Sequence, residues 1–225
     1  DNHRLSNLGH VLLPIYHSNR KSNGEDIFEI TIDEESNAID GKFLGKDDII
    51  IFPITEESIT RSGAKIAPHA ISDELSYLAD EIDKNKNNEY IKGINSLLEY
   101  EKDHNNESLR IIGKYILNNN ILDDFLKYFM GNTDYSIDKK KWVLKFEVKE
   151  SNDKTKIKSM DLNKIFITFK INKLLKSDIT LTRDIGIHKF YSNYVKHINN
   201  SKEELYYCNI TGKKEYCIDK LRGII

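Results

Sequence analysis

The first third of the chain alternates apolar and polar residues with the period of two that is typical of strands. Residues 27–32 follow this pattern, and residues 49–52 form a short apolar run, rich in β-branched side chains, that ends at Pro53. Asp40 and Gly41 lie between Ala38-Ile39 and Lys42-Phe43. This dipeptide predicts a tight hairpin turn, because both turn positions favour positive φ. The pattern therefore predicts a small antiparallel sheet within the first 55 residues.

A helical block is predicted next. Residues 55–69 contain few apolar side chains, and Gly63 and Pro68 interrupt any period, so this segment is predicted to be a loop. Over residues 70–82, 89–104, 107–118 and 121–130, apolar residues recur every three or four positions, as on one face of a helix. The asparagines at 105–106 and 118–120 are expected to separate these helices, because short amides cap helices more readily than they extend them.

The period of two returns after Gly131, over residues 142–149 and 165–169, with the polar run 149–158 between these two predicted strands. Residues 184–199 again have a helical pattern. The predicted fold class is α+β: an antiparallel sheet unit with a helical insertion, followed by a second sheet-and-helix unit. We place the domains at residues 1–133 and 134–225, with one continuous domain as the alternative.

The net charge of −2 over 225 residues hides a division between the two parts of the chain. Residues 1–137 hold 14 Lys and Arg against 25 Asp and Glu, whereas residues 138–225 hold 20 against 11. The second part therefore carries a net charge of +9. Such an asymmetry suggests that one face meets a polyanion, although scattered, solvated lysines are the alternative. The candidate phosphate-binding residues are Lys139, Lys140, Lys141, Lys156 and Lys158.

Several classes of protein are not indicated. No apolar run reaches the roughly 18 residues of a spanning helix, and the first residues lack a signal-peptide pattern, so we expect a cytoplasmic protein with no membrane partner. Cys208 and Cys217 are too few for a zinc site and are expected to be inert thiols. The seven histidines form no zinc-binding motif, and no nucleophile elbow or phosphate-binding glycine loop is present. We expect no enzymatic activity, no metal and no cofactor.

The segment from Ser58 to Lys65 is the second candidate site. Thr60, Arg61, Ser62 and Lys65 supply hydroxyl donors and cations beside Gly63, which allows a close approach to another surface. Such a loop can donate hydrogen bonds to phosphate oxygens or to base edges. The alternative is an ordinary loop in which Arg61 pairs with Glu56 or Glu57.

A resemblance to a known family rests mainly on residues 52–79. The string Phe-Pro-Ile-Thr-Glu-Glu-Ser-Ile-Thr-Arg-Ser-Gly at 52–63, followed by Ala-Pro-His-Ala-Ile-Ser-Asp-Glu-Leu-Ser-Tyr-Leu-Ala at 67–79, resembles the amino-terminal signature of the large subunit of the type I-C CRISPR surveillance complex, Cascade. Residues 13–17 and the Cys-x-x-Thr-Gly element at 208–212 are also similar to that family. The family's chains are longer, so the resemblance implies an amino-terminal portion. The usual histidine after Cys-x-x-Thr-Gly is absent, and Asp219 and Lys220 stand near its place.

The resemblance implies a non-catalytic DNA-recognition subunit that recognises the protospacer-adjacent motif and assists opening of the target duplex. Its expected partners are double-stranded target DNA and the Cascade subunits that hold the guide RNA, with a viral anti-CRISPR inhibitor as a further candidate. The alternative function is a protein-interaction module that docks on other Cascade subunits without touching bases. Whether the 58–65 loop and the lysines of 139–158 share a face distinguishes the two.

Overall fold

The computed structural model describes residues 16–62, 65–149, 155–174 and 177–200, together with the short paired strands β11 (Tyr206–Tyr207) and β12 (Lys214–Glu215). Cys208 and Cys217, the 13–15 part of the early family element and the segment after residue 215 lie outside the described residues. Expectations about those segments therefore stay predictions.

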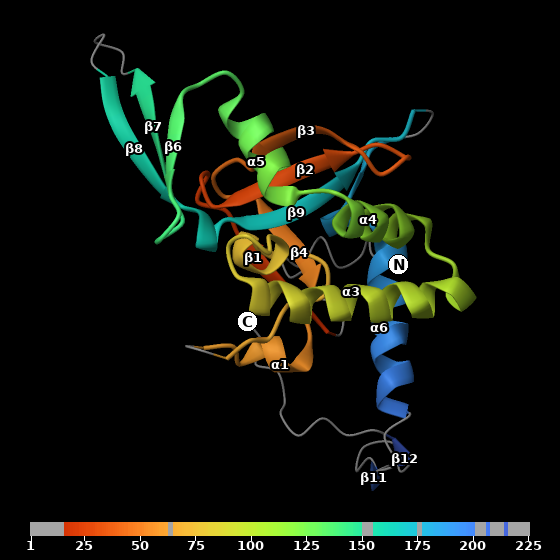
Figure 1. Ribbon diagram of the computed structural model, residues 1–225. Coiled ribbons are helices and arrows are strands. Elements are labelled where there is room, and N and C mark those ends of the chain that lie inside the picture. The colour runs from red at the N-terminus through yellow and green to blue at the C-terminus, as the bar shows by residue number, and fades with distance from the viewer. Residues whose placement is uncertain are drawn as a thin grey trace.

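The centre of the molecule is a five-stranded mixed sheet (Figure 1). Its strands are β2 (Ile27–Ile32), β3 (Ala38–Phe43), β5 (Asp73–Glu74), β9 (Phe166–Ile171) and β10 (Ile179–Thr180). They follow the order β10-β9-β2-β3, with β5 also paired to β9. The α+β class is confirmed, but β2 and β9 run parallel, so the central sheet is not wholly antiparallel. One sheet thus joins strands from both sides of residue 133.

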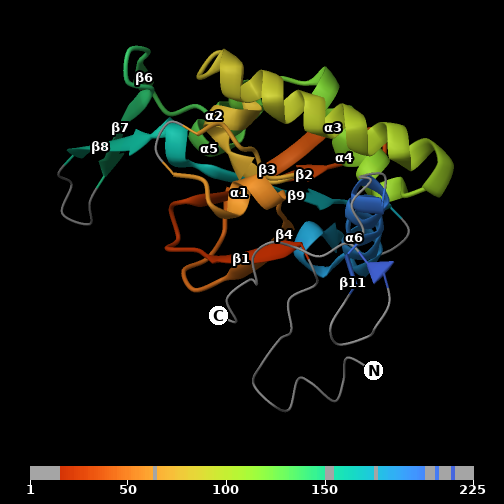
Figure 2. The same ribbon diagram turned by 90° about the horizontal axis from the view of Figure 1, so that it is seen from below.

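Both faces of this sheet are covered (Figure 2). On one face lie α3 (Lys84–His104), α4 (Glu107–Asn118) and α5 (Ile121–Met130). On the other lie the antiparallel pair β1 (His17–Lys21) and β4 (Ile49–Pro53), and α6 (Ile185–Asn200). Phe28 of β2 packs on Phe125 of α5 with ring centroids 4.8 Å apart, and Phe52 of β4 packs on Phe166 of β9 at 4.9 Å. The alternation in β2 does not mark a solvent-exposed face, because the second layer buries its polar residues too.

The helical block has the predicted asparagine boundaries. Asn106 caps α4 by accepting a hydrogen bond from the backbone N–H of Leu109, and Asn120 caps α5 by accepting one from Asp123. These caps satisfy backbone donors that the first helical turn leaves without partners. The prediction of three helices over 89–130 is confirmed.

The prediction of a hairpin turn at Asp40 and Gly41 is wrong. Both residues lie within β3, and the chain turns earlier, where the Asp33 carboxylate accepts hydrogen bonds from the backbone of Glu35 and Asn37. Gly41 serves a different purpose in the strand: a Cβ atom there would lie 2.7 Å from the ring of Phe28. A glycine therefore lets an aromatic ring approach the backbone closely.

The amphipathic helix predicted over 70–82 is also corrected. Residues 73–74 form β5, followed by the single turn α2 (Leu75–Leu78). Asp73 and Glu74 pair with Ile167 and Phe166 of β9, and the Leu75 N–H donates to the carbonyl of Ile165 at 2.7 Å. Pairing with the sheet edge takes the backbone groups that a helix would have used, so tertiary structure overrides the local period.

The remaining described elements complete the chain. They are α1 (Glu56–Ile59), β6 (Tyr135–Asp138), β7 (Val143–Lys149), β8 (Thr155–Asp161), η2 (Leu162–Lys164) and η3 (Leu181–Arg183). The polar run 149–158 was predicted to separate two strands, but Lys149 is the last residue of β7 and residues 155–158 belong to β8. Strands β6, β7 and β8 form an antiparallel sheet that projects from the body of the molecule in both views (Figures 1 and 2). We call residues 135–149 and 155–161 the arm.

Candidate nucleic-acid interface

The segment that follows β4 begins with a capped helical turn, in place of the irregular loop predicted for 55–69. The Thr55 hydroxyl accepts a hydrogen bond from the Ser58 N–H at 3.2 Å and donates to the carbonyl of Pro68 at 2.8 Å. The Ser58 hydroxyl donates back to the Thr55 carbonyl at 2.8 Å. One threonine thereby starts α1 and also ties the two ends of the segment together.

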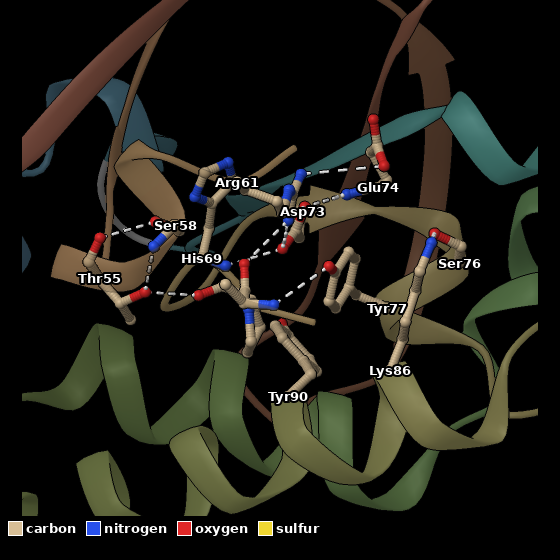
Figure 3. A network of polar contacts seen from close by, with 12 residues as sticks. Thr55, Ser58, Arg61, His69, Asp73, Glu74, Ser76, Tyr77, Lys86 and Tyr90 are labelled. Atoms are coloured by element: carbon tan, nitrogen blue, oxygen red, sulfur yellow. Dashed lines mark hydrogen bonds and ion pairs between the residues drawn. The ribbon is translucent and has the colours of Figure 1, made fainter. Parts of the chain in front are cut away.

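Asp73 is the centre of a buried polar network (Figure 3). Nη1 of Arg61 donates to both carboxylate oxygens of Asp73, at 2.8 and 2.9 Å. The backbone N–H groups of His69 and Glu74 each donate to the same carboxylate at 2.7 Å. The Asp73 side chain is 0% exposed and that of Arg61 is 17% exposed, so this ion pair lies largely out of water. Four charge-assisted hydrogen bonds stabilise the buried carboxylate.

The guanidinium of Arg61 also packs on an aromatic ring. Its Cζ atom lies 4.6 Å from the ring centroid of Tyr77, and Nη1 donates to the Ala67 carbonyl at 3.3 Å. The Lys86 ammonium lies 5.1 Å from the same ring, and Figure 3 shows Tyr77 between the two cations. Burial by itself lowers the pKa of Arg61, but the hydrogen bonds and charge of Asp73 outweigh it and raise the pKa above its ordinary value.

This placement corrects two expectations about Arg61. Its carboxylate partners are Asp73 and Glu74, not Glu56 or Glu57, with the Glu74 contact at 3.8 Å. Because its donors face the chain's own carboxylates, the guanidinium is poorly placed for the base contact expected from the sequence. Arg61 instead anchors the segment from which neighbouring side chains project.

The other members of the predicted loop lie on the surface. Thr60, Ser62 and Lys65 are exposed, and the Lys65 ammonium donates to the Glu57 carbonyl at 3.4 Å. Together with Arg61, Ser62 and Lys65 line a depression that Tyr77 and Lys86 also border. The three exposed side chains can meet a ligand without breaking the buried network.

The candidate lysines all lie on the arm and are exposed. Lys139, Lys140 and Lys141 occupy the turn between β6 and β7, and Lys156 and Lys158 lie on β8. Over its residues the arm carries seven lysines against three acidic residues, a net charge of +4. Lys158 makes an exposed ion pair with Glu25 of the body at 2.8 Å. The arm is therefore a projecting, basic, antiparallel sheet.

The strand register separates these lysines into two groups. Lys156 pairs with Val148 and Lys158 with Phe146, toward the far end of the arm, whereas the 139–141 turn adjoins Val143 at its root. The five residue steps from Asp161 to Lys156 along β8 span about 17 Å. The two groups therefore lie along the length of the arm and do not form one compact patch.

The root of the arm adjoins the Arg61 segment. The Asn163 amide of η2 donates to the Lys141 carbonyl at 3.0 Å, and the Leu162 N–H donates to the Trp142 carbonyl at 2.9 Å. η2 in turn packs against α2, whose Tyr77 supports Arg61. The turn at 139–141 is thus connected through η2 and α2 to Arg61. The side chains of Thr60, Ser62 and Lys65, which are exposed around Arg61, are called the rim below.

Within the part of the chain that the structure describes, no three His, Cys, Asp or Glu side chains gather as they would around a metal ion. None of the described helices combines the length and the apolar character needed to cross a bilayer.

A comparison with protein families decides the relationship of the chain. A family model described as CRISPR-associated protein, Cas_Csd1, matches residues 2–224. The chain belongs to the Csd1 family of CRISPR-associated proteins. This is the family of the type I-C Cascade large subunit, so the resemblance seen in residues 52–79 is confirmed. No curated protein matches the chain.

In this Csd1-family chain, the signature residues build the buried network. Pro68, His69, Asp73 and Tyr77 stand in the Pro-His-x-x-x-Asp-x-x-x-Tyr element. Asp73 and Tyr77 contact Arg61 directly, and the His69 N–H donates to Asp73. The cations and hydroxyl groups of residues 58–65 indicated Arg61 as a candidate site residue. They did not indicate Asp73 or Tyr77, which the structure shows to be its partners. The four-residue spacing from His69 to Asp73 to Tyr77 was the available signal.

Proposed function

We propose that this Cascade subunit is a non-catalytic DNA-recognition protein that engages the duplex beside the guide-matched target, recognises the protospacer-adjacent motif and assists duplex opening. The observation that carries the proposal is the basic arm, which projects from the body with seven lysines against three acidic residues. In RNA-guided effectors, base pairing reads the target while protein reads the flanking motif and the duplex shape.

The arm has the shape and the charge for contact with a duplex. A β-ribbon can enter the major groove of DNA, and lysine ammonium groups on a ribbon can pair with phosphates along the backbone. Lys139, Lys140 and Lys141 lie at the root of the arm, which η2 and α2 connect to the segment that carries Ser62 and Lys65. We assign the lysine turn to phosphate contact, and Thr60, Ser62 and Lys65 to contact with the flanking base pairs.

The lysine turn is tested by replacing Lys139, Lys140 and Lys141 with Glu in the assembled complex. Each lost phosphate contact lowers the slope of log affinity against log salt by about 1, so the slope for duplex binding is expected to fall by about 3. Binding should weaken alike for all flanking sequences, because phosphates carry no sequence information. Affinity is measured by fluorescence anisotropy on duplexes with varied flanking motifs at several salt concentrations.

The matched control reverses three exposed lysines on the helical layer, Lys92, Lys102 and Lys114, and changes the charge by the same amount. Its salt slope is expected to stay at the wild-type value. Equal losses in the two triple variants would mean that net charge alone governs binding, and an unchanged slope in the arm variant would remove the turn from the interface.

The rim is tested separately with Ser62→Ala and Lys65→Ala combined. A base-edge contact typically contributes about 1–3 kcal/mol of discrimination, so the preference between flanking motifs is expected to shrink by roughly tenfold. The salt slope should fall by no more than about 1. Competition binding between preferred and scrambled flanking motifs measures the preference, and an unchanged preference would rule out the rim as the reader.

A further inference from the structure

We propose that a groove beside the junction of α4 and α5 is a docking site for a basic segment of another Cascade subunit, one that carries lysine or arginine next to an aliphatic side chain. The partner is a protein, and its binding does not depend on DNA recognition by the arm or the rim. The residues that line the groove, their charges and one exposed leucine carry this assignment.

The groove lies where three parts of the chain meet. One wall is the turn after α2 with the first part of α3, and the other is the junction at residues 118–120 with the adjoining ends of α4 and α5. Nδ2 of Asn120 donates to the Glu81 carboxylate at 2.6 Å, and Nδ2 of Asn87 donates to the Tyr77 carbonyl at 3.0 Å. These bonds tie the walls together. The groove is therefore already formed, and its volume of about 400 Å³ suits a few side chains better than a single ion.

The groove has a negative charge. Asp80 and Glu81 are exposed, and no lysine, arginine or histidine is among the described residues that line it. Lys84 and Lys114 are exposed on the adjoining helices but lie outside the lining. Residues 116–118, the carboxyl end of α4, also border the groove, and the last carbonyl groups of a helix carry partial negative charge because they have no partner within the helix. Cations are therefore favoured here, and a phosphate chain is disfavoured.

The lining is also apolar in part, which separates a protein partner from a simple cation. Leu78, Ile116 and Ile121 are buried, whereas Leu117 is 39% exposed. An inorganic cation would pair with the carboxylates and leave Leu117 in water. A lysine or arginine pairs with the same carboxylates, while its alkyl stem and an aliphatic neighbour cover the leucine. The combination of carboxylates and an exposed leucine thus favours a basic segment of a protein.

The charge is tested with Asp80→Lys in the full chain, a change that an exposed position should tolerate. The probe is the Cascade complex assembled with its guide RNA but without this subunit, and binding is measured by biolayer interferometry at several salt concentrations. We expect affinity to fall about tenfold and its salt dependence to become weaker, because a like charge now faces the basic segment. The control is Asp103→Lys, exposed at the far end of α3, for which a change of less than twofold is expected.

The apolar contact is tested with Leu117→Ser, and Ile185→Ser at the start of α6 is its control, because Ile185 is 55% exposed. Loss of a partly exposed leucine from an interface should weaken binding about fivefold, and the control should change it less than twofold. Equal affinity of the two aspartate variants, or of the two serine variants, would overturn the proposal.

Cross-linking identifies the occupant. A photoreactive benzoylphenylalanine in place of Leu117 should attach, in the assembled complex, to a lysine- or arginine-bearing segment of another subunit. Attachment to nucleic acid or to a second copy of this chain would overturn the proposal. Once assembled, complexes with Asp80→Lys should bind target duplexes with the wild-type salt slope, whereas the triple lysine variant should assemble normally. Failure of one proposal is therefore distinguishable from failure of the other.

Discussion

Replacing Asp73 with Ala is expected to lower the free energy of unfolding by about 3–5 kcal/mol, the usual cost of removing one partner from a buried ion pair. The substitution leaves the Arg61 guanidinium, whose side chain is 17% exposed, without its main counter-charge. It also removes the acceptor for the backbone N–H groups of His69 and Glu74. Urea denaturation followed by circular dichroism measures the difference in unfolding free energy.

Two further variants show whether this loss belongs to the buried pair. Glu99→Ala removes the exposed ion pair with Lys102, whose side chains are 73% and 68% exposed, and should change stability by less than about 1 kcal/mol. Replacing both Arg61 and Asp73 should lower the free energy of unfolding by less than the sum of the two single changes, because the double variant leaves no unpaired charge in the interior. A loss below about 1 kcal/mol for Asp73→Ala would contradict the role of the pair as the anchor of this segment.

Acid should destabilise the protein through His69 in a defined pH range. Burial, assisted by the positive charge of Arg61, lowers the pKa of His69 from 6.5 to about 4. The negative charge of Asp73 raises this pKa but does not outweigh burial. The Nδ1 atom of the ring is buried and has no hydrogen-bond partner among the residues that the structure describes. The folded state therefore keeps the ring neutral where the unfolded chain already binds a proton.

The sign of the effect follows from this difference in proton binding. Above pH 6.5 both states are neutral at His69, so the residue contributes no pH dependence. As the pH falls from 6.5 to about 4, the unfolded state is increasingly favoured, and below about 4 the effect levels off. At about 1.4 kcal/mol for each pKa unit, the loss is on the order of 3 kcal/mol.

His69→Phe isolates this contribution. The ring centroid of His69 lies 5.1 Å from that of Phe52 and 6.2 Å from that of Phe166. A phenyl group at this position therefore retains the aromatic packing and removes the titratable group. The wild-type protein should lose stability relative to the variant between pH 6.5 and 4, as measured by denaturation at a series of pH values. His104→Phe, at an exposed position, is the control. A pH profile for His69→Phe that is parallel to the wild-type profile would show that another group titrates.

The candidate site shows how far residue types alone lead. Charge counting located the lysines of 139–158, and these side chains are exposed, because a desolvated ammonium group without a partner is too costly to bury. The same reasoning placed Arg61 on the surface, but its partner lies 12 positions away at Asp73. That carboxylate reaches Arg61 only because β5 pairs with the edge of β9, a contact between residues 73–74 and 166–167.

By itself, the sequence determined the features that depend on near neighbours along the chain. These are the α+β class, the helices over 89–130 with their asparagine caps, the end of β4 at Pro53 and the basic character of the arm. The tertiary structure decided the parallel pairing of β2 with β9, the conversion of 70–82 into a strand and one helical turn, and the inward course of Arg61. These depend on contacts between distant segments, whose hydrogen bonds and burial outweigh local preferences that amount to only about 1 kcal/mol or less per residue.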